Sequence, residues 1–274
     1  MKQISNICPK EKCTGCYACV NICSKNAIKI DRDELGFSYP FIDPAFCVNC
    51  GLCVSVCPSH SALPFNLPLK AIIAHASDEA EQKTSTSGGL ASVFSRYIIS
   101  HHGVVYGCSG ADGKNIRHIR VEQESGLFFL KGSKYVQSEI GEIYRLAKND
   151  LRTKRLVLFI GTPCQVAGLK SFLGQEYENL YTIDFVCHGV PSQQLLTDYL
   201  SQYILKGASY CVSFRKKMFM DIAIMACLCL IFLKYLSWKN GSLKIIISLA
   251  FCRDYFTGKV VTIVIIPRKN ECRI

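Results

Sequence analysis

The stretch CTGCYACVNIC at residues 13–23 decides the fold of the N-terminal part, because it recurs 34 residues later as CVNCGLCVSVC at residues 47–57. Each copy has the form C-x2-C-x2-C-x3-C; Pro58 follows the second copy, whereas Ser24 follows the first. Of the 17 cysteines in the 274 residues, eight lie in these two copies. Thiolates are soft ligands that select zinc, copper(I) or iron–sulfur clusters. The repeat therefore predicts two equivalent metal-binding halves.

The spacing of these eight cysteines is that of bacterial ferredoxins with two 4Fe-4S clusters. In such proteins three cysteines of one copy bind one cluster, and the fourth cysteine of that copy binds the other cluster. The sequence therefore predicts two crossed ligand sets, which are Cys13, Cys16, Cys19 and Cys57 for cluster 1, and Cys47, Cys50, Cys53 and Cys23 for cluster 2. Short strands at 27–30 and 38–42, with a turn at 34–36, complete the expected α+β ferredoxin-like domain over residues 1–66.

Zinc is the competing interpretation of clustered cysteines. Structural zinc sites usually combine two C-x2-C pairs that lie far apart in the sequence. The fused C-x2-C-x2-C-x3-C spacing favours iron–sulfur clusters instead. Cys8 lies outside both copies, and we interpret it as an ordinary buried or loop thiol and not as a ligand.

The composition is that of a folded chain, with 49% apolar residues, 19% charged residues and a formal net charge of +11. It excludes a disordered chain. The N-terminus has no apolar segment of the signal-peptide type, and metal-binding cysteines are expected in a reducing compartment, so we expect a cytoplasmic protein. The basic residues are scattered and do not form a stripe with interleaved aromatic residues, so a nucleic acid is not an expected partner.

Strand-like and helix-like segments alternate over residues 67–217. Apolar runs predict strands at 70–76, 103–108, 116–121, 156–160 and 181–186. Apolar residues at helical spacing predict helices at 88–100 and 139–151, a helix after residue 165 that ends near 172, and one that ends near 205. This alternation predicts an α/β domain with a largely parallel sheet.

Three segments of the α/β domain stand at strand–helix junctions, where parallel sheets bind their ligands. They are TSTSGG (84–89), GTPCQ (161–165) and CHGVPS (187–192), and KGSKY (131–135) is a basic loop between them. Taken singly, each has an ordinary structural interpretation as a helix cap, a turn or a solvated loop. By the same reasoning, Cys164 is a buried thiol and His188 a structural histidine unless their context gives them a role.

Taken together, the segments resemble a known family. The ferredoxin repeat is followed in order by TSTSGGLAS (84–92), KGSKYVQS (131–138), GTPCQVAGLKSFL (161–173) and DFVCHGVPS (184–192). This combination resembles the coenzyme F420 hydrogenase/dehydrogenase beta-subunit family, in its form with a fused ferredoxin domain, over about residues 8–215. The resemblance implies an α/β flavin-binding domain that holds FAD or FMN beside the clusters, with coenzyme F420 as a substrate in some members.

The resemblance also implies a set of site residues. The flavin would contact Ser87, Gly88, Gly89, Thr162, Pro163, Cys164 and Gln165, and its phosphates would be reached by Lys131, Ser133 and Lys134. Cys164 and His188 are the candidate catalytic residues, and His188 is a candidate proton donor because histidine titrates near neutral pH. A redox partner protein or subunit and a small-molecule hydride donor or acceptor are the expected partners.

Residues 218–274 break the pattern, with eight Lys or Arg, three Asp or Glu and ten Ile, and the resemblance stops near residue 217. One interpretation is a membrane segment, but the apolar run 222–233 has only 12 residues, against the roughly 20 that span a bilayer. A second interpretation is a divergent folded C-terminus. The third is a frameshift after about codon 217, which we favour and which would leave the α/β domain truncated.

The functional prediction is an oxidoreductase that passes electrons between two 4Fe-4S clusters and a flavin, with hydride transfer to or from F420 or another small molecule. A flavin fits between the two chemistries because clusters carry single electrons and a hydride carries two. The alternatives are an electron-transfer subunit without its own turnover and an inactive truncated family member.

Overall fold

The computed structural model describes residues 4–60, 71–110, 115–202, 212, 214 and 262–264. Its N-terminal part is built from five short elements, which are η1 (Lys10–Lys12), α1 (Ala18–Ile22), β1 (Ile28–Arg32), β2 (Ser38–Ile42) and α2 (Leu52–Ser55). β1 and β2 pair as an antiparallel hairpin, and the Asp33 carboxylate closes its turn by accepting hydrogen bonds from the backbone of Leu35 and Phe37. The hairpin predicted for this part is confirmed.

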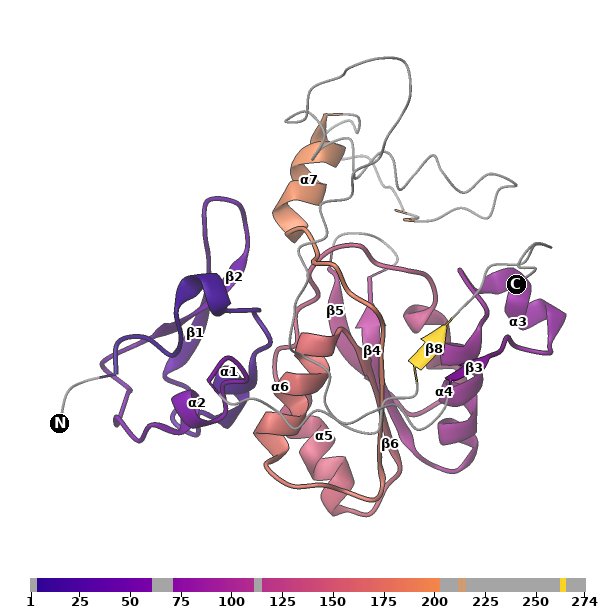
Figure 1. Ribbon diagram of the computed structural model, residues 1–274, viewed down its shortest axis with the longest axis horizontal. Helices are drawn as coiled ribbons and strands as arrows, with labels where there is room; N and C mark the ends of the chain where they lie inside the picture. Colours follow the sequence, from indigo (N-terminus) through magenta and orange to yellow (C-terminus); the bar gives the residue numbers. More distant parts are fainter. Residues whose placement is uncertain are drawn as a thin grey trace.

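A four-stranded sheet forms the centre of the second part (Figure 1). Its strands are β4 (Val104–Ser109), β5 (Arg117–Val121), β6 (Val157–Gly161) and β7 (Leu180–Asp184), in the order β5-β4-β6-β7. β4, β6 and β7 are parallel, and β5 joins the edge of β4 in the antiparallel direction. Every residue of β6 is buried, as expected for a strand covered on both faces. The largely parallel sheet predicted from the alternation is confirmed.

Helices cover both faces of this sheet (Figure 1). α4 (Leu90–Ser100) and η2 (Glu124–Leu130) lie on one face, and α5 (Ile143–Arg152) and α6 (Pro163–Leu173) lie on the other. Successive residues of a strand point to opposite faces; Val105 and Leu158 therefore join the α4 core, while Tyr106 and Phe159 join the α5–α6 core.

The ferredoxin-like part packs on the outer side of α5 and α6 (Figure 1). Helix α1 contacts both helices. Tyr17 is buried in the same apolar core as the α5–α6 face of the sheet, and Val20 and Ile30 pack against that core. The two parts therefore share one core, with α5 and α6 as the layer between them.

Four smaller elements complete the described structure: α3 (Glu79–Thr84), α7 (Gln193–Ser201), and the strands β3 (Ala71–Ile73) and β8 (Thr262–Val264), which pair in parallel. Neither α3 nor η2 is foreseen by the sequence patterns. Helix α5 begins at Ile143 and not at 139, because Glu139 is engaged in backbone hydrogen bonds with Ile116 and His118 at the end of β5.

Part of the predicted organisation lies outside the described residues. The predicted domain boundary near residue 66 and almost all of the atypical tail 218–274 lie outside the described residues. The frameshift therefore stays a prediction. Within the part of the chain that the structure describes, no helix is both long and apolar enough to cross a membrane.

Candidate metal centres and cofactor site

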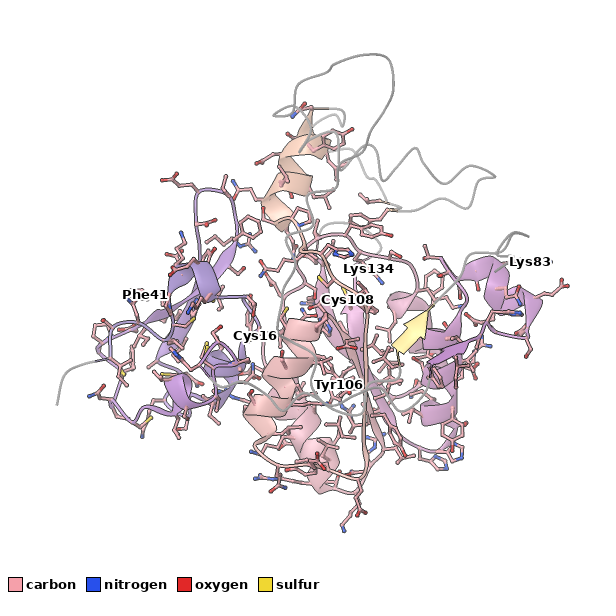
Figure 2. The ribbon with its side chains drawn as sticks, viewed as in Figure 1. Cys16, Phe41, Lys83, Tyr106, Cys108 and Lys134 are labelled. Atoms are coloured by element: carbon pink, nitrogen blue, oxygen red, sulfur yellow. The ribbon has the colours of Figure 1, made fainter. Side chains whose placement is uncertain are left out.

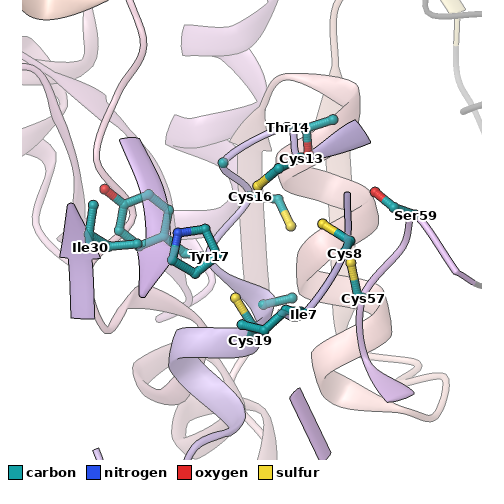
Figure 3. Close-up of a pocket in the computed structure, with 13 residues that line it drawn as sticks. Ile7, Cys8, Cys13, Thr14, Cys16, Tyr17, Cys19, Ile30, Cys57 and Ser59 are labelled. Carbon is teal, nitrogen blue, oxygen red and sulfur yellow. The ribbon is translucent and has the colours of Figure 1, made fainter. Parts of the chain in front are cut away.

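The eight cysteines of the repeat line two separate cavities in the ferredoxin-like part. The first cavity is lined by Cys13, Cys16, Cys19 and Cys57, together with Cys8 (Figure 3). The second cavity is lined by Cys23, Cys47, Cys50 and Cys53. The two spaces are alike in size, at about 380 and 410 Å³. Each cavity thus gathers three cysteines of one copy and the fourth cysteine of the other copy, which is the grouping that two crossed 4Fe-4S ligand sets require.

The backbone repeats as well as the sequence. In the first loop Gly15 and Tyr17, on either side of Cys16, have φ of 63° and 65°. In the second loop Asn49 and Gly51, on either side of Cys50, have φ of 56° and 80°. Left-handed backbone is unfavourable for residues other than glycine, so each loop accepts one such residue in order to wrap around its cavity. This paired geometry follows the 34-residue repeat and is not visible in the residue types, because glycine occupies a different member of the pair in each loop.

Backbone N–H groups point at the cysteine sulfurs in the same repeated manner. Asn49 N donates to Cys47 Sγ at 3.4 Å, and Gly15 N donates to Cys13, its counterpart in the first loop. Ala27 N donates to Cys23 Sγ at 3.3 Å. Such donors stabilise negative charge on cluster sulfurs and help set the reduction potential. The loops therefore present both thiols and the donors that a cluster uses.

The thiols of the first cavity are strongly desolvated. Burial raises the pKa of Cys16 to about 12, with a smaller contribution from the neighbouring thiols. Burial also raises the pKa of Cys13 in the first cavity and of Cys53 in the second. Metal coordination deprotonates a thiol outright. Burial disfavours an uncoordinated thiolate at these positions, so the cysteines suit coordination to iron. Among the described residues, no three or more His, Cys, Asp or Glu side chains converge on a point that would suit a single metal ion.

The first cavity, called cluster cavity 1 from here on, borders helix α6 of the α/β part. A Cβ atom added to Gly168 would lie 3.0 Å from Cys16 Cβ and 3.1 Å from Cys16 Sγ. Distances this short are rare for real Cβ atoms, and the Tyr144 hydroxyl lies equally close at 3.0 Å, so any larger residue at this position would push against the cysteine loop. Cys164, one turn earlier on α6, is close enough to affect the pKa of Cys16. Figure 2 shows Cys16 on the side of the ferredoxin-like part that faces α6.

The interface also contains polar contacts that the sequence gives no reason to expect. Tyr144 on α5 is fully buried, and its hydroxyl lies 2.8 Å from both Cys16 O and Gln165 O. Arg145 donates to the carbonyl oxygens at the end of α1, which belong to Val20, Asn21 and Cys23. Val20 O and Cys23 O also accept from the backbone N–H groups of Cys23 and Asn26, and the guanidinium of Arg145 adds donors to this end of α1 from the α/β part.

Two of the motifs meet on the opposite side of the sheet. Lys131 Nζ donates to Thr84 Oγ1 at 2.7 Å, and Ser133 N donates to Thr86 Oγ1 at 3.2 Å. The buried carboxylate of Glu81 pairs with Lys131 Nζ at 2.8 Å. Burial raises the pKa of Glu81, but hydrogen bonds from Lys131, Ser85 and Ser92 outweigh it and lower the pKa overall. The structure thus joins TSTSGG to the basic loop through a carboxylate that sequence reasoning missed.

Gly88 and Gly89 lie at the start of α4. Gly89 has φ of 79°, and a Cβ there would lie 3.1 Å from Ala76 Cβ. No side chain caps the first turn of α4. Ser87 precedes the two glycines and is half-buried. The loop therefore offers a helix N-terminus next to Lys131, a combination that suits an anionic group.

Lys134 is already engaged by the protein. Its Nζ donates to the carbonyl oxygens of Cys108, Leu130 and Lys131 at 2.9 to 3.0 Å. Burial lowers the pKa of Lys134, and the Cys108 thiol raises it by a smaller amount. Figure 2 shows Lys134 beside Cys108 at the end of β4. In this arrangement the ammonium group holds the loop in shape, and its predicted contact with a phosphate stays a prediction.

A buried polar chain connects the basic segment to GTPCQ. Gln165 Oε1 accepts from Thr162 N at 3.0 Å, and Gln165 Nε2 donates to Ser138 Oγ at 2.9 Å. Ser138 Oγ lies 3.0 Å from His118 Nδ1, and His118 Nε2 lies 3.0 Å from Ile160 O. Because a carbonyl can only accept, Nε2 carries the proton and Nδ1 accepts from Ser138. Burial lowers the pKa of His118 to about 4, which keeps the ring neutral.

The remaining motif, CHGVPS, follows β7. Ser192 caps α7, and its hydroxyl donates to Leu35 O of the ferredoxin-like hairpin at 2.5 Å. Pro191 O accepts from Gln137 N at 2.8 Å. His188 is exposed. Segment 131–138 thus touches TSTSGG through its first residues, and GTPCQ and CHGVPS through its last, which joins the four motifs into one connected region.

Several residues of this region escape sequence reasoning. Glu81, His118, Tyr144 and Arg145 lie in no recognisable motif, and these partners are 20 to 128 residues away in the sequence. The sequence favours an ordinary thiol at Cys8, whereas the structure places it on the wall of the first cavity. The first 30 residues hold no local signal that distinguishes Cys8 from a loop thiol.

Comparisons with known proteins match the ferredoxin-like part and the later portion of the α/β part. Residues 12–61 match the family model of the 4Fe-4S dicluster domain, and residues 154–219 match the model for the C terminus of the coenzyme F420 hydrogenase/dehydrogenase beta subunit. An uncharacterized ferredoxin of Methanocaldococcus jannaschii is 37% identical over 57 residues, which are 21% of this chain and 73% of that relative. An uncharacterized protein from the rpl9–rpl11 intergenic region of Porphyra purpurea is 34% identical over 55 residues, 19% of this chain and 73% of that relative.

One solved structure gives a partial match. A chain of the F420-reducing NiFe hydrogenase complex from Methanosarcina barkeri, studied by xenon derivatization, matches with a TM-score of 0.38 and 16% identity. The match covers 49% of this chain and 50% of that chain, so this chain spans half of its length in the comparison. The chain therefore carries a 4Fe-4S dicluster domain of the ferredoxin family, followed by a segment that matches the C terminus of the coenzyme F420 hydrogenase/dehydrogenase beta subunit.

Proposed function

We propose that this protein is an iron–sulfur flavoprotein oxidoreductase that exchanges electrons between two 4Fe-4S clusters and a flavin, with F420 or another small molecule as hydride donor or acceptor. One observation carries the proposal: helix α6 begins within the GTPCQ segment and packs against the cysteine loop of cluster cavity 1. The match of residues 154–219 to the F420 hydrogenase/dehydrogenase family suggests this substrate class.

The proposed ligands are those of the two cavities. Cys13, Cys16, Cys19 and Cys57 would hold cluster 1, and Cys23, Cys47, Cys50 and Cys53 would hold cluster 2. The crossed grouping, the repeated left-handed backbone and the N–H donors support this assignment. Cluster 1 is then the cluster next to the α/β part, since Cys16 packs on Gly168. Cys50 of cluster 2 is exposed, which suits electron exchange with an external redox protein or subunit.

The flavin site is proposed at the connected motif region. Ser87, Gly88 and Gly89 would present backbone N–H groups, and Lys131 and Ser133 would face the phosphate. The uncapped start of α4 and the cations around Glu81 fit an anionic group. Thr162, Pro163, Cys164 and Gln165 would shape the other side, where Gln165 is held by Ser138. When bound, the flavin supplies the conversion between one-electron and two-electron chemistry.

His188 is proposed as the proton donor and Cys164 as a second candidate catalytic residue. His188 is exposed at the C-terminal edge of the sheet, where a small molecule can reach it. Cys164 is half-buried at the start of α6, within hydrogen-bond distance of Thr162 Oγ1 at 3.2 Å. Helix N-termini stabilise thiolates.

The test is anaerobic purification of the full chain, followed by quantification of iron, sulfide and flavin with a visible spectrum. We expect about eight iron atoms and one flavin per chain. A Lys131→Met variant should lose flavin affinity, whereas Lys83→Ala, which removes an exposed lysine of the neighbouring α3, should not. Eight iron atoms without flavin would instead identify an electron-transfer subunit, and loss of both would identify an inactive family member.

A further inference from the structure

The first cluster cavity contains one cysteine more than a cluster needs. A 4Fe-4S cluster takes four thiolates, and the second cavity offers four cysteines, but the first is lined by five. The extra one is Cys8, which lies outside the repeat and outside residues 12–61, the range of the dicluster domain. The two cavities are therefore chemically unequal although their loops repeat.

Cys8 is held at the cavity wall by its neighbours. Ile7 is 4% exposed and belongs to the apolar core between the cavities. Its carbonyl oxygen lies 2.6 Å from His60 Nε2. Ser59 Oγ donates to Lys12 O at 2.8 Å on the other side of the segment. The backbone on both sides of Cys8 is thus fixed to residues that directly follow Cys57.

The Cys8 sulfur is directed at two of the cluster 1 cysteines. It lies within hydrogen-bonding reach of the sulfurs of Cys13 and Cys57. Figure 3 shows the Cys8 sulfur beside that of Cys57 and facing the same space as those of Cys13, Cys16 and Cys19. A thiol in this position can donate a hydrogen bond to a ligating sulfur without binding iron itself.

We propose that Cys8 is a hydrogen-bond donor to the ligand sulfurs of cluster 1 and raises the reduction potential of this cluster. The inference rests on the ligand assignment given under the proposed function. Reduction adds negative charge to the cluster, and a donor to its sulfurs stabilises that charge. The cysteines that line the second cavity are its four proposed ligands, without a fifth thiol. An electron at cluster 1, beside α6, is then held more strongly than it would be without this thiol.

The experiment is a redox titration of the reconstituted full chain, followed by electron paramagnetic resonance, for the wild type, Cys8→Ala and Cys8→Ser. In Cys8→Ala we expect the ratio of reduced to oxidised cluster 1 at a fixed potential to fall about tenfold, which corresponds to about 59 mV for one electron. Cys8→Ser keeps a donor and should recover most of this shift. Cluster 2 is the internal control, and its signal is identified with a Cys53→Ser variant.

Two results would overturn the proposal. Unchanged potentials of both clusters in Cys8→Ala would show that the thiol donates no useful hydrogen bond. Loss of about half of the iron in Cys8→Ala would show that Cys8 is a ligand and not a donor. A separate Cys57→Ala variant tests the underlying assignment, because retention of both intact clusters in that variant would contradict the ligand set itself. The two failures can therefore be told apart by iron content.

Discussion

The hydroxyl of Tyr144 lies 2.8 Å from the carbonyl oxygen of Cys16, so one buried side chain of the α/β part contacts the loop that carries the central cysteine of cluster cavity 1. The same hydroxyl lies 2.8 Å from Gln165 O, in the first turn of α6. A single phenol thus joins the cysteine loop to the GTPCQ segment. This contact fixes the relative position of the two regions that the proposed electron exchange requires.

Removal of this hydroxyl should destabilise the protein. In Tyr144→Phe, two buried carbonyl oxygens lose their shared donor, and we expect a cost of about 1–3 kcal/mol in the free energy of unfolding. Anaerobic guanidinium unfolding of the cluster-loaded protein measures it. Tyr181→Phe is the matched control, because Tyr181 is 52% exposed and its change should stay within about 0.5 kcal/mol. Equal effects in the two variants would contradict the role of Tyr144.

The close approach of α6 to the cysteine loop predicts a second effect. In Gly168→Ala the new methyl group would meet Cys16 Cβ and Sγ, so we expect cluster 1 to be lost or distorted while cluster 2 remains. Alanine is favoured over glycine within a helix by about 1 kcal/mol, so a loss of iron here would have a steric cause. Iron content and the electron paramagnetic resonance spectrum measure the effect.

The control for Gly168→Ala is Gly107→Ala in β4. Its added Cβ would meet only the ends of the Leu130 side chain, at 3.3 Å, and these can move. We expect Gly107→Ala to keep both clusters. If Gly168→Ala keeps the iron content and the electron paramagnetic resonance spectrum of the wild type, the packing of α6 on the cysteine loop does not limit cluster 1.

The sequence carries enough information to predict the two halves but not their junction. Eight cysteines at fixed spacing predict the two cavities because metal chemistry constrains that spacing, and the apolar run 156–160 predicts β6 because a doubly covered strand must be apolar. Glycine is a different matter. In the sequence Gly168 is an ordinary helix residue, and only its contacts with Cys16 and Tyr144 show that a side chain there would be crowded.

The polar side chains of the junction could not be predicted for a related reason. Arg145 lies in an amphipathic helix, where a charged residue ordinarily faces solvent. Its partners are backbone carbonyl oxygens more than a hundred residues earlier, and any residue type supplies such an oxygen. His118 likewise sits in a strand-like run, and its contact with Ser138 depends on the register of β5.

Arg145 predicts how strongly the two parts are coupled. Its planar guanidinium serves several carbonyl oxygens at the end of α1, which a lysine ammonium cannot reproduce. We expect Arg145→Lys to lower the free energy of unfolding by about 2 kcal/mol and to separate the unfolding of the ferredoxin-like part from that of the α/β part. Far-ultraviolet circular dichroism and loss of cluster absorbance, followed together, measure both. Arg152→Lys, an exposed position of the same helix, is the control, and coincident transitions in Arg145→Lys would refute the coupling.

His118 predicts a dependence of stability on pH. Burial lowers its pKa to about 4 in the folded protein, whereas an unfolded histidine titrates near 6.5. Protonation below pH 6.5 therefore favours the unfolded chain, so this contribution to stability is complete above pH 6.5 and is lost as the pH falls towards 4. Between pH 7.5 and 5.5 we expect the free energy of unfolding to fall by about 1 kcal/mol because of this residue. The measurement is denaturant unfolding at both pH values in the wild type and in His118→Gln, whose decrease should be smaller by that amount. His101→Gln removes an exposed histidine and should keep the wild-type decrease; if His118→Gln keeps it too, the buried ring is not the group that titrates.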